Sequence, residues 1–449
     1  MEKRIVVLGA GESGAGAAVL AAVQGFEVFV SDKGEIEEKY KELLKDYNVL
    51  YEEKQHTESL ILNADEIIKS PGIPETAPMV VMAREQGIPV ISEIEFAARY
   101  TNAVKICITG SNGKTTTTML IYHILKKAGL NVGLAGNVGQ SFAYQVATRE
   151  YDYYVIELSS FQLDNMYEFK SDLSVLMNIT PDHLDRYDHK FQNYIDAKFR
   201  ILQNTTAKEA FIYCSDDEVI INEMSKREIL ATQFEFTQKK KNVKRGAMLS
   251  EDEKSIDYVV NNNKTLSMLI DDLAIKGKHN VYNSMAAGIV AQVLNIRNDV
   301  IRDSLMDFKN VEHRMEPVLT VRGIKFVNDS KATNINSVWY ALESTTTPVV
   351  WIVGGKDKGN DYEVLRDLVK EKVTAIVCLG IDNTPIHKAF DNMGLPMVDV
   401  TSMDDAVKKA YEMGNPGDTV LLSPACASFD LFDNYEDRGN KFKLAVRNL

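Results

Sequence analysis

A glycine-rich segment with a lysine and several threonines separates an apolar run, VKICIT, from a helix-like stretch, TTTTMLIYHILKK. Two glycines allow the backbone to turn so that its N–H groups face phosphate oxygens, and the positive end of the following helix favours an anion. Only two residues separate the glycines, whereas a full Walker motif has four, so an ordinary turn with an incidental lysine is the alternative. We predict a phosphate-binding loop made of Gly110, Ser111, Asn112, Gly113, Lys114, Thr115 and Thr116.

An acid suited to hold a metal ion stands at the end of the run YDYYVIE, as Glu157. At the carboxyl edge of a parallel sheet such a carboxylate would lie beside the phosphate loop. A strand-end glutamate is often only solvated, but Ser159, Ser160 and Gln162 keep the next residues polar, as a cleft requires. We therefore predict Glu157 as a magnesium ligand together with the hydroxyl of Thr115, and Lys114 as a phosphate-binding cation.

A second glycine-rich turn, Gly9-Ala-Gly11-Glu-Ser-Gly14, follows the first apolar run, and Asp32 ends the next one. This is the pattern of a dinucleotide-binding domain, and alone it would indicate a nicotinamide-dependent oxidoreductase. Two observations favour another interpretation. The block ends after about 100 residues, too few for both halves of such a domain, and an oxidoreductase needs no second phosphate loop. A turn of this kind also holds the diphosphate of a nucleotide sugar.

The composition fits a globular protein of several domains: 449 residues, 45% hydrophobic and 26% charged. A net charge of −13 argues against nucleic acid as a partner. No apolar run approaches the roughly 20 residues needed to cross a bilayer, and the first residues do not form a signal peptide. The four cysteines are scattered without a Cys-x-x-Cys pair, which indicates reduced thiols and a cytoplasmic protein.

Short β-branched runs alternate with helical patterns along most of the chain, which indicates an α/β fold with parallel sheets. Between about 233 and 270 the pattern changes to short polar strands, from which we expect a small antiparallel excursion. We predict three α/β domains, over residues 1–101, 102–310 and 311–449.

Motifs in a fixed order resemble the Mur ligases of peptidoglycan precursor synthesis, a family related to folylpolyglutamate synthase. They are TGSNGKTTT, AGNVG, ELSSFQL, NITPDHLDRY, DAKFRI, HNVYNSMAA, EHRMEPV and NDSKATN. GGKDKG and SPACASFDLFDNYEDRGN are similar to the branch of the family that adds D-glutamate. Individually several of these strings are weak, but the ordered set is specific and extends over essentially the whole chain.

The resemblance implies an N-terminal Rossmann-like nucleotide-sugar domain, a central P-loop ATPase-like domain and a C-terminal Rossmann-like domain. It also implies a reaction in which ATP phosphorylates the carboxylate of UDP-N-acetylmuramoyl-L-alanine and D-glutamate attacks the acyl phosphate. Another amino-acid-adding ligase of the Mur or folylpolyglutamate type stays an alternative. So do the oxidoreductase and a nucleotide-sugar-binding protein without turnover.

The resemblance further assigns roles to individual residues around ATP and two magnesium ions. His183 would bind the second magnesium, and Lys198 would be carbamylated so that its new carboxylate supports the metals. The reaction of lysine with carbon dioxide needs an uncharged amine, which desolvation favours; an ordinary solvated helix lysine is the alternative. Further contacts to ATP are expected from Asn280, Arg314, Asp329 and Lys331.

The two other substrates are assigned in the same way, for an enzyme that we expect to be monomeric. The uridine nucleotide substrate would contact Ser13, Asp32, Lys33, Gly72, Asn137 and Ser159. D-Glutamate would contact Thr333, Lys358, Ser428 and Phe429. The register of GGKDKGND favours Lys358, with Lys356 as the alternative two residues earlier.

Overall fold

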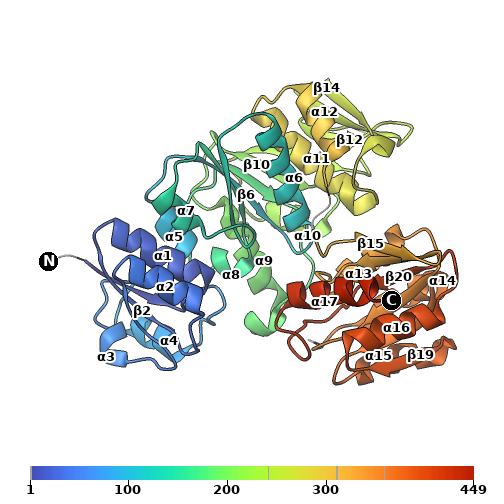
Figure 1. Cartoon of the computed structure of the whole chain (residues 1–449). Helices are drawn as coiled ribbons and strands as arrows, with labels where there is room; N and C mark the ends of the chain where they lie inside the picture. The colour runs from blue at the N-terminus through green and yellow to red at the C-terminus, as the bar shows by residue number, and fades with distance from the viewer. Residues whose placement is uncertain (1–2, 241, 310–311, 358) are drawn as a thin grey trace. The chain divides into compact units, whose positions relative to one another are not determined.

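The computed structural model of the chain describes residues 3–240, 242–309, 312–357 and 359–449. It forms two compact units, each an α/β assembly (Figure 1). The first comprises Met1–Leu273 with Tyr282–Asp307, and the second comprises Ala274–Val281 with Phe308–Leu449. No helix in these described ranges is both long and apolar enough to cross a bilayer.

The first unit begins with a five-stranded parallel sheet in the order β3-β2-β1-β4-β5. Its strands are β1 (Arg4–Leu8), β2 (Glu27–Ser31), β3 (Leu50–Glu52), β4 (Glu66–Lys69) and β5 (Val90–Ser92). Its helices are α1 (Glu12–Val23), α2 (Glu38–Asp46), α3 (Glu58–Ile61), α4 (Pro78–Glu85) and α5 (Glu93–Ala98). Strand β1 is central and buried from Ile5 to Leu8, and the glycine-rich turn that follows it lies at the carboxyl edge of the sheet.

A nine-stranded sheet follows in the order β14-β13-β12-β11-β10-β9-β6-β8-β7. Its strands are β6 (Val104–Thr109), β7 (Val132–Gly136), β8 (Tyr153–Glu157), β9 (Leu173–Leu176), β10 (Ala210–Cys214), β11 (Thr232–Thr237), β12 (Gly246–Leu249), β13 (Ser255–Val260) and β14 (Asn263–Leu269). Its helices are α6 (Lys114–Lys127), α7 (Phe142–Thr148), α8 (Ser160–Leu163), α9 (Phe191–Phe199), α10 (Glu218–Met224), α11 (Lys278–Val293) and α12 (Asn298–Asp307). Strands β6 and β8 are parallel neighbours, so residues that follow them meet at one edge.

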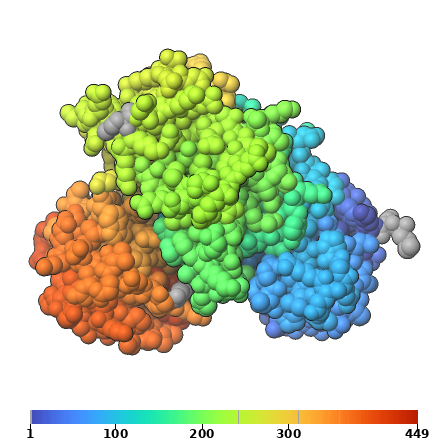
Figure 2. Space-filling model, turned by 180° about the vertical axis from the view of Figure 1, so that it is seen from behind, coloured from blue at the N-terminus to red at the C-terminus, as the bar shows by residue number. Residues whose placement is uncertain are grey.

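The segment expected to form a small antiparallel excursion contains antiparallel strand pairs, as expected, and also extends this sheet. Strand β11 pairs in parallel with both β10 and β12, and only the pairs β12–β13 and β13–β14 are antiparallel. The buried aromatic residues Phe236 and Tyr258 attach these strands to the core. The polar residues around them in the sequence gave no sign of this attachment. This part of the chain is yellow-green in the space-filling view (Figure 2).

The two sheets of the first unit share one hydrophobic core. Buried side chains from α1 and α5 pack in the same cluster as Phe142 of α7 and Tyr154 of β8. Glu12 and Glu93 add polar contacts to Ser141, which caps α7. This continuous core makes one compact unit of the two sheets, and the residue boundaries 1–101 and 102–310 stay a prediction.

The second unit contains a six-stranded sheet in the order β15-β16-β20-β17-β18-β19, parallel except for the β15–β16 pair. Its strands are β15 (Glu316–Val321), β16 (Ile324–Asn328), β17 (Val349–Val353), β18 (Val373–Leu379), β19 (Met397–Val400) and β20 (Thr419–Leu422). Its helices are α13 (Ile335–Ser344), α14 (Arg366–Lys372), α15 (Thr384–Phe390), α16 (Met403–Met413) and α17 (Tyr435–Arg447). Helices α13 to α15 cover one face, and α16 and α17 cover the other.

Candidate active site

The glycine-rich loop between β6 and α6 has the backbone that its sequence predicts. Gly110 and Gly113 have positive φ angles of 147° and 81°. A Cβ at Gly113 would lie 2.6 Å from Oδ1 of Asn283, so a larger residue would be strained and crowded there. Thr115 and Thr116 are buried in the first turn of α6, and Lys114 donates from Nζ to the carbonyls of Gly110 and Ser111 at 2.9 Å. The loop therefore brings a cation, hydroxyls and a helix N-terminus together.

Asn178 holds this loop from the neighbouring strand end, a role that was not predicted from the sequence. Its carbonyl oxygen accepts from the N–H of Ser111 at 2.9 Å, and its Oδ1 accepts from the N–H of Asn112 at 2.8 Å. Nδ2 of Asn178 donates a hydrogen bond to the carbonyl of Asn112 at 3.0 Å. The residue belongs to the motif NITPDHLDRY, so its place in a motif was the signal that could have identified it.

Glu157 ends β8 as predicted and is 1% exposed. Its Oε1 accepts from Nδ2 of Asn137 at 2.8 Å, whereas Oε2 is buried with no hydrogen-bond partner among the described residues. A buried carboxylate oxygen without a partner is costly, and a bound cation satisfies it. Asn137 donates to Glu157, and Ser159 caps α8 in a capping box with Gln162. The expected contact of both residues with the uridine nucleotide stays a prediction.

Lys198 lies on α9 and is 1% exposed, although its helical pattern is also that of a solvated lysine. Its Nζ donates to Oγ1 of Thr109 at 3.3 Å and lies 5.0 Å from the ring centre of Tyr194. Burial, with a smaller contribution from the positive charge of Lys114, holds the pKa of Lys198 well below its ordinary value. The amine therefore has the uncharged character that carbamylation needs.

His183 directly precedes the short 3-10 helix η1 (Leu184–Arg186) and has a positive φ of 52°. Its ring is 5.2 Å from that of Phe161, and Nε2 lies 3.7 Å from Oδ2 of Asp182. Asp182 is also among the charges that act on Lys198, so this turn lies within electrostatic reach of the buried lysine. Within the first unit, the phosphate loop, Glu157, Lys198 and the His183 turn thus belong to one region.

A cavity of about 980 Å³ lies at the carboxyl edge of the first sheet. Its lining includes four residues predicted for the uridine nucleotide, namely Ser13, Asp32, Lys33 and Gly72, but not Asn137 or Ser159. Oδ2 of Asp32 accepts from the N–H of Ala10, and Oδ1 accepts from that of Gly34, each at 2.7 Å. Asp32 therefore fixes the glycine-rich turn in addition to facing the cavity.

Arg186 links this cavity to the His183 turn. Its guanidinium donates to the carbonyls of Pro71, Gly72 and Ile73 at 3.4 to 3.5 Å and lies over the ring of Phe161. These carbonyls belong to the segment SPGI that lines the cavity. The motif NITPDHLDRY therefore contributes to both regions of the first unit.

The second unit gathers the remaining residues expected at ATP. Asp329 is 1% exposed, and its Oδ2 accepts from Ser423 Oγ at 2.9 Å while its Oδ1 accepts from the N–H of Met315 at 3.1 Å. Burial raises the pKa of Asp329 to about 6, and Arg314 opposes this rise. Asn280 donates from Nδ2 to Lys276 O at 2.7 Å, and Lys331 lies 5.1 Å from the ring centre of Tyr435.

Three residues expected at D-glutamate, Thr333, Ser428 and Phe429, follow the strands β16 and β20, which are parallel neighbours. Ser428 is buried, Thr333 is half-buried and Phe429 is exposed. Lys358 lies outside the described residues. Lys356, the alternative, exchanges backbone hydrogen bonds with Ala427 at 2.9 and 3.2 Å, which joins the two loops beside Ser428.

Arg438 was not identified from the sequence and joins the loops of this region. Although it is 1% exposed, its guanidinium donates to Ser330 Oγ at 3.0 Å, Ser330 O at 2.8 Å and Cys426 O at 3.1 Å. Burial lowers its pKa to about 10. Its motif, NYEDRGN, was the available signal, but an arginine on a helix gives no sign of burial in the sequence itself.

Comparisons with family models cover most of the chain. A Mur ligase middle domain matches residues 108–291, and a Mur ligase glutamate ligase domain matches residues 313–426. The MurD N-terminal domain matches residues 4–79.

Two relatives are named UDP-N-acetylmuramoylalanine--D-glutamate ligase. The protein from Bacteroides thetaiotaomicron is 60% identical over 100% of both chains. That from Porphyromonas gingivalis is 55% identical over 99% of this chain and 98% of its own.

Solved structures show the same fold at lower identity. UDP-N-acetylmuramate-alanine ligase from Thermotoga maritima matches with a TM-score of 0.64 and 17% identity over 100% of both chains. A pseudomurein peptide ligase type C from Methanothermus fervidus matches with a TM-score of 0.64 and 19% identity, over 99% of this chain and 100% of that one.

Proposed function

The chain belongs to the Mur ligase family, and on that premise we propose that it adds D-glutamate to UDP-N-acetylmuramoyl-L-alanine at the expense of ATP. The observation that carries this proposal is the first unit's combination of a phosphate loop, a buried carboxylate oxygen without a partner and a buried lysine amine. Relatives that share 55 to 60% of their residues over the full length carry the name of this activity.

The family uses ATP, and magnesium is expected with it. The donors present suit that ion because Mg²⁺ prefers hard oxygen ligands. Glu157 Oε2 is buried without a partner among the described residues, and Thr115 places a buried hydroxyl in the first turn of α6. Thr115 and Glu157 would hold one ion and His183 would contribute to a second. When bound, magnesium neutralises phosphate charge and favours phosphoryl transfer.

Two bonds are exchanged in the proposed reaction. An oxygen of the L-alanyl carboxylate bonds to the γ-phosphorus of ATP while the bond to the leaving ADP oxygen breaks. The amine of D-glutamate then bonds to the acyl carbon, phosphate leaves, and the amine loses a proton. Both reactants of the first step are anions, so positive groups at the phosphates lower the barrier. We assign this role to Lys114 and to the loop N–H groups at the start of α6.

We propose that Lys198 is carbamylated and that its carboxylate takes part in the metal site with Glu157. Burial lowers the pKa of the amine and so favours its uncharged form, whose nitrogen can bond to the carbon of carbon dioxide with loss of one proton. The product is an anion beside Lys114, whose charge acts directly on Lys198. The bare amine of Lys198 donates to the hydroxyl of Thr109 and lies over the ring of Tyr194.

The remaining assignments follow the division of the chain into substrate regions. Residues 1–101 would bind the uridine nucleotide in the 980 Å³ cavity, residues 102–310 would bind ATP, and residues 311–449 would bind the amino acid. Asn280, Arg314, Asp329 and Lys331 would contact ATP, while Thr333, Ser428, Phe429 and Lys358 or Lys356 would contact D-glutamate. Four free, buried cysteines support a reducing compartment, and we propose a cytoplasmic monomer.

The test is ADP release in mixtures of ATP, magnesium, UDP-N-acetylmuramoyl-L-alanine and one amino acid at a time. We expect turnover with D-glutamate. Turnover only with L-lysine or a diamino acid would move the chain to another branch of the family. Binding of the nucleotide without ADP release would contradict ligase activity, and hydride transfer to a nicotinamide would restore the oxidoreductase interpretation.

A further inference from the structure

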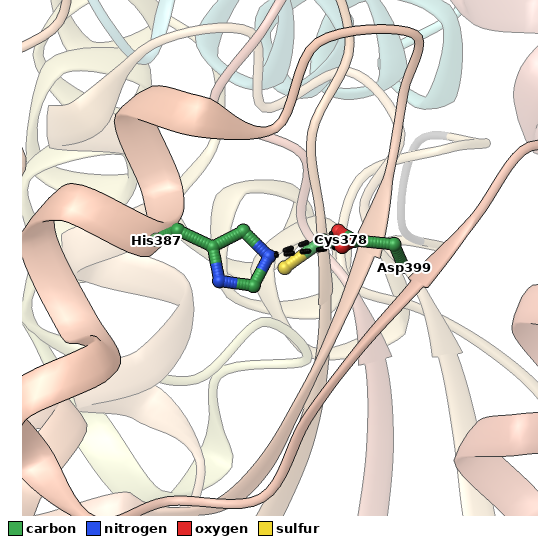
Figure 3. Close-up of side chains that lie close together, drawn as sticks. All are labelled: Cys378, His387 and Asp399. Carbon is green, nitrogen blue, oxygen red and sulfur yellow. Dashed lines mark hydrogen bonds and ion pairs between the residues drawn. The ribbon is translucent and has the colours of Figure 1, made fainter.

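A cysteine, a histidine and an aspartate converge at one edge of the second unit's sheet. Cys378 on β18 and Asp399 on β19 are direct partners in the parallel register, so their side chains project from the same face. His387 lies on α15, the helix that covers this face beside the edge strand. Figure 3 shows the imidazole directed toward both partners. In the described part of the chain, this is the one such group whose ligand atoms all lie within 4.8 Å of one another.

The histidine is already oriented as a metal-bound histidine would be. Its Nε2 lies 3.0 and 3.1 Å from the two carboxylate oxygens of Asp399, on the side of the thiol. Its Nδ1 is 2.7 Å from Oδ1 of Asp391. A carboxylate behind the second ring nitrogen fixes the tautomer and orientation of a ligating imidazole. Asn383 also donates to Oδ1 of Asp399 at 3.0 Å, which holds the aspartate in place.

We propose that Cys378, His387 and Asp399 form a site for a divalent transition metal of the zinc class, separate from the magnesium sites of the ligase reaction. A thiolate, an imidazole and a carboxylate are the donors that Zn²⁺ accepts, whereas Mg²⁺ prefers oxygen alone. The thiolate and the carboxylate balance the charge of the ion. Asp399 is exposed and Cys378 is buried, so the ion would lie at the rim with its fourth position open to water.

Small side-chain movements are enough to close the site. Zinc bonds are about 2.0 to 2.3 Å long, and the half-exposed His387 and the exposed Asp399 can rotate toward the fixed thiol. The bound ion would join β18, the edge strand β19 and α15 through one centre. It would thereby hold the edge strand β19, which has only one neighbour in its sheet.

The experiment uses the full chain, freed of metal with a chelator and then titrated with Co²⁺ and Zn²⁺ in the absence of nucleotide. We expect one equivalent of Co²⁺ to produce a thiolate-to-cobalt charge-transfer band and the intense visible bands of a tetrahedral ion, and Zn²⁺ to displace it. Cys378→Ser should abolish the charge-transfer band, and His387→Gln should reduce affinity at least tenfold. Asp391→Asn should keep the band and weaken affinity by about tenfold, as for an outer partner.

Two control variants separate this site from incidental binding. Cys214→Ser removes another buried free thiol. His123→Gln removes a histidine that lies 2.8 Å from Asp307 and that belongs to no three-ligand group among the described residues. Both should leave the cobalt spectrum unchanged. The proposal is overturned if the chain binds no Co²⁺, or if His387→Gln and Cys378→Ser bind it as wild type does. His387→Gln keeps the test decisive should Cys378→Ser not fold. None of these readings depends on ligase turnover.

Discussion

Nδ2 of Asn137 donates a hydrogen bond of 2.8 Å to Oε1 of Glu157, and the N–H of Asn137 donates to the Glu157 carbonyl at 2.9 Å. The pair joins the end of β8 to the loop after β7. One carboxylate oxygen is thereby occupied, and Oε2 remains buried with no partner in the described ranges. The arrangement orients Glu157 and leaves this oxygen for the magnesium ion that we propose there.

This relationship predicts different effects for changes at the two residues. Glu157→Gln should lower turnover by about a hundredfold or more, because the oxygen facing the metal loses its charge. Asn137→Ala should keep Glu157 charged and weaken magnesium affinity by about tenfold, as loss of an outer partner commonly does. ADP release measured against magnesium concentration separates these effects. If Asn137→Ala instead changes only the KM of the uridine substrate, Asn137 contacts that substrate, as the resemblance implies.

Lys114→Ala should lower turnover by at least two orders of magnitude, because one phosphate-binding cation commonly supplies about 3 kcal/mol to such a transition state. Lys126→Ala, at the exposed far end of the same helix, is the matched control and should be active. The readout is the steady-state rate of ADP release with saturating substrates. A Lys114→Ala enzyme with more than a tenth of the wild-type rate would remove the loop lysine from the mechanism.

Lys198→Ala should lose activity and recover part of it when short carboxylic acids are added, because they can take the place of the carbamate. Lys190→Ala, at the exposed start of α9, should behave like wild type with or without the acids. Mass spectrometry of peptides is unsuited to a labile carbamate, so ¹³C NMR with labelled bicarbonate is the direct measurement. No carbamate signal together with no rescue would contradict the modification.

Local patterns in the sequence were sufficient for some of these features but not for others. The strand, loop and helix around Lys114 are consecutive, and the position of Glu157 follows from the geometry of parallel strands. The burial of Lys198 and Arg438 could not be read from helical patterns, since it depends on strands and loops distant in sequence. The parallel pairing of β11 was missed because its alternating polar residues are typical of either strand direction.

Glu93 makes the stability of the first unit depend on pH. Burial raises its pKa from 4.5 to about 7, and the negative charge of Glu12 adds to this rise. A raised carboxyl pKa means that the native state binds the proton more tightly, so the stabilisation is complete below pH 4.5 and is lost as pH rises through 7. Glu93→Gln keeps an acceptor for Ser141 and Ala143 without titrating.

The measurement is the urea-unfolding midpoint of wild type and Glu93→Gln from about pH 5 to about pH 8. From the low to the high end of this range, the free energy of unfolding of the variant should rise relative to that of the wild type by an amount on the order of 2 kcal/mol. Glu85→Gln, at an exposed helix position, is the control and should follow the wild type. A parallel pH dependence of Glu93→Gln and wild type would show that Glu93 does not titrate differently on unfolding.

The last prediction concerns selection of the amino acid by its side-chain carboxylate. A second carboxylate that enters an acidic protein needs a local cation. The loop after β17 places the backbone of Lys356 beside the Ser428 loop, and Lys358 follows two residues later in the sequence. A charge-assisted hydrogen bond in such a site contributes roughly 1.5 to 3 kcal/mol, and an analogue without the carboxylate leaves the lysine unpaired. D-Glutamine and D-norvaline should therefore be poorer acceptors than D-glutamate by about two orders of magnitude in kcat/KM.

Separate substitutions distinguish the two lysines. The backbone of Lys356 is bonded to Ala427, so Lys356→Ala keeps the loop connection and removes only the side chain. Whichever of Lys356→Ala and Lys358→Ala raises the KM for D-glutamate while narrowing its advantage over D-glutamine identifies the recognising cation. A general loss of kcat at equal selectivity would indicate that the lysine acts elsewhere in the reaction. If both variants keep the full preference for D-glutamate, the carboxylate pocket lies on another loop of the second unit.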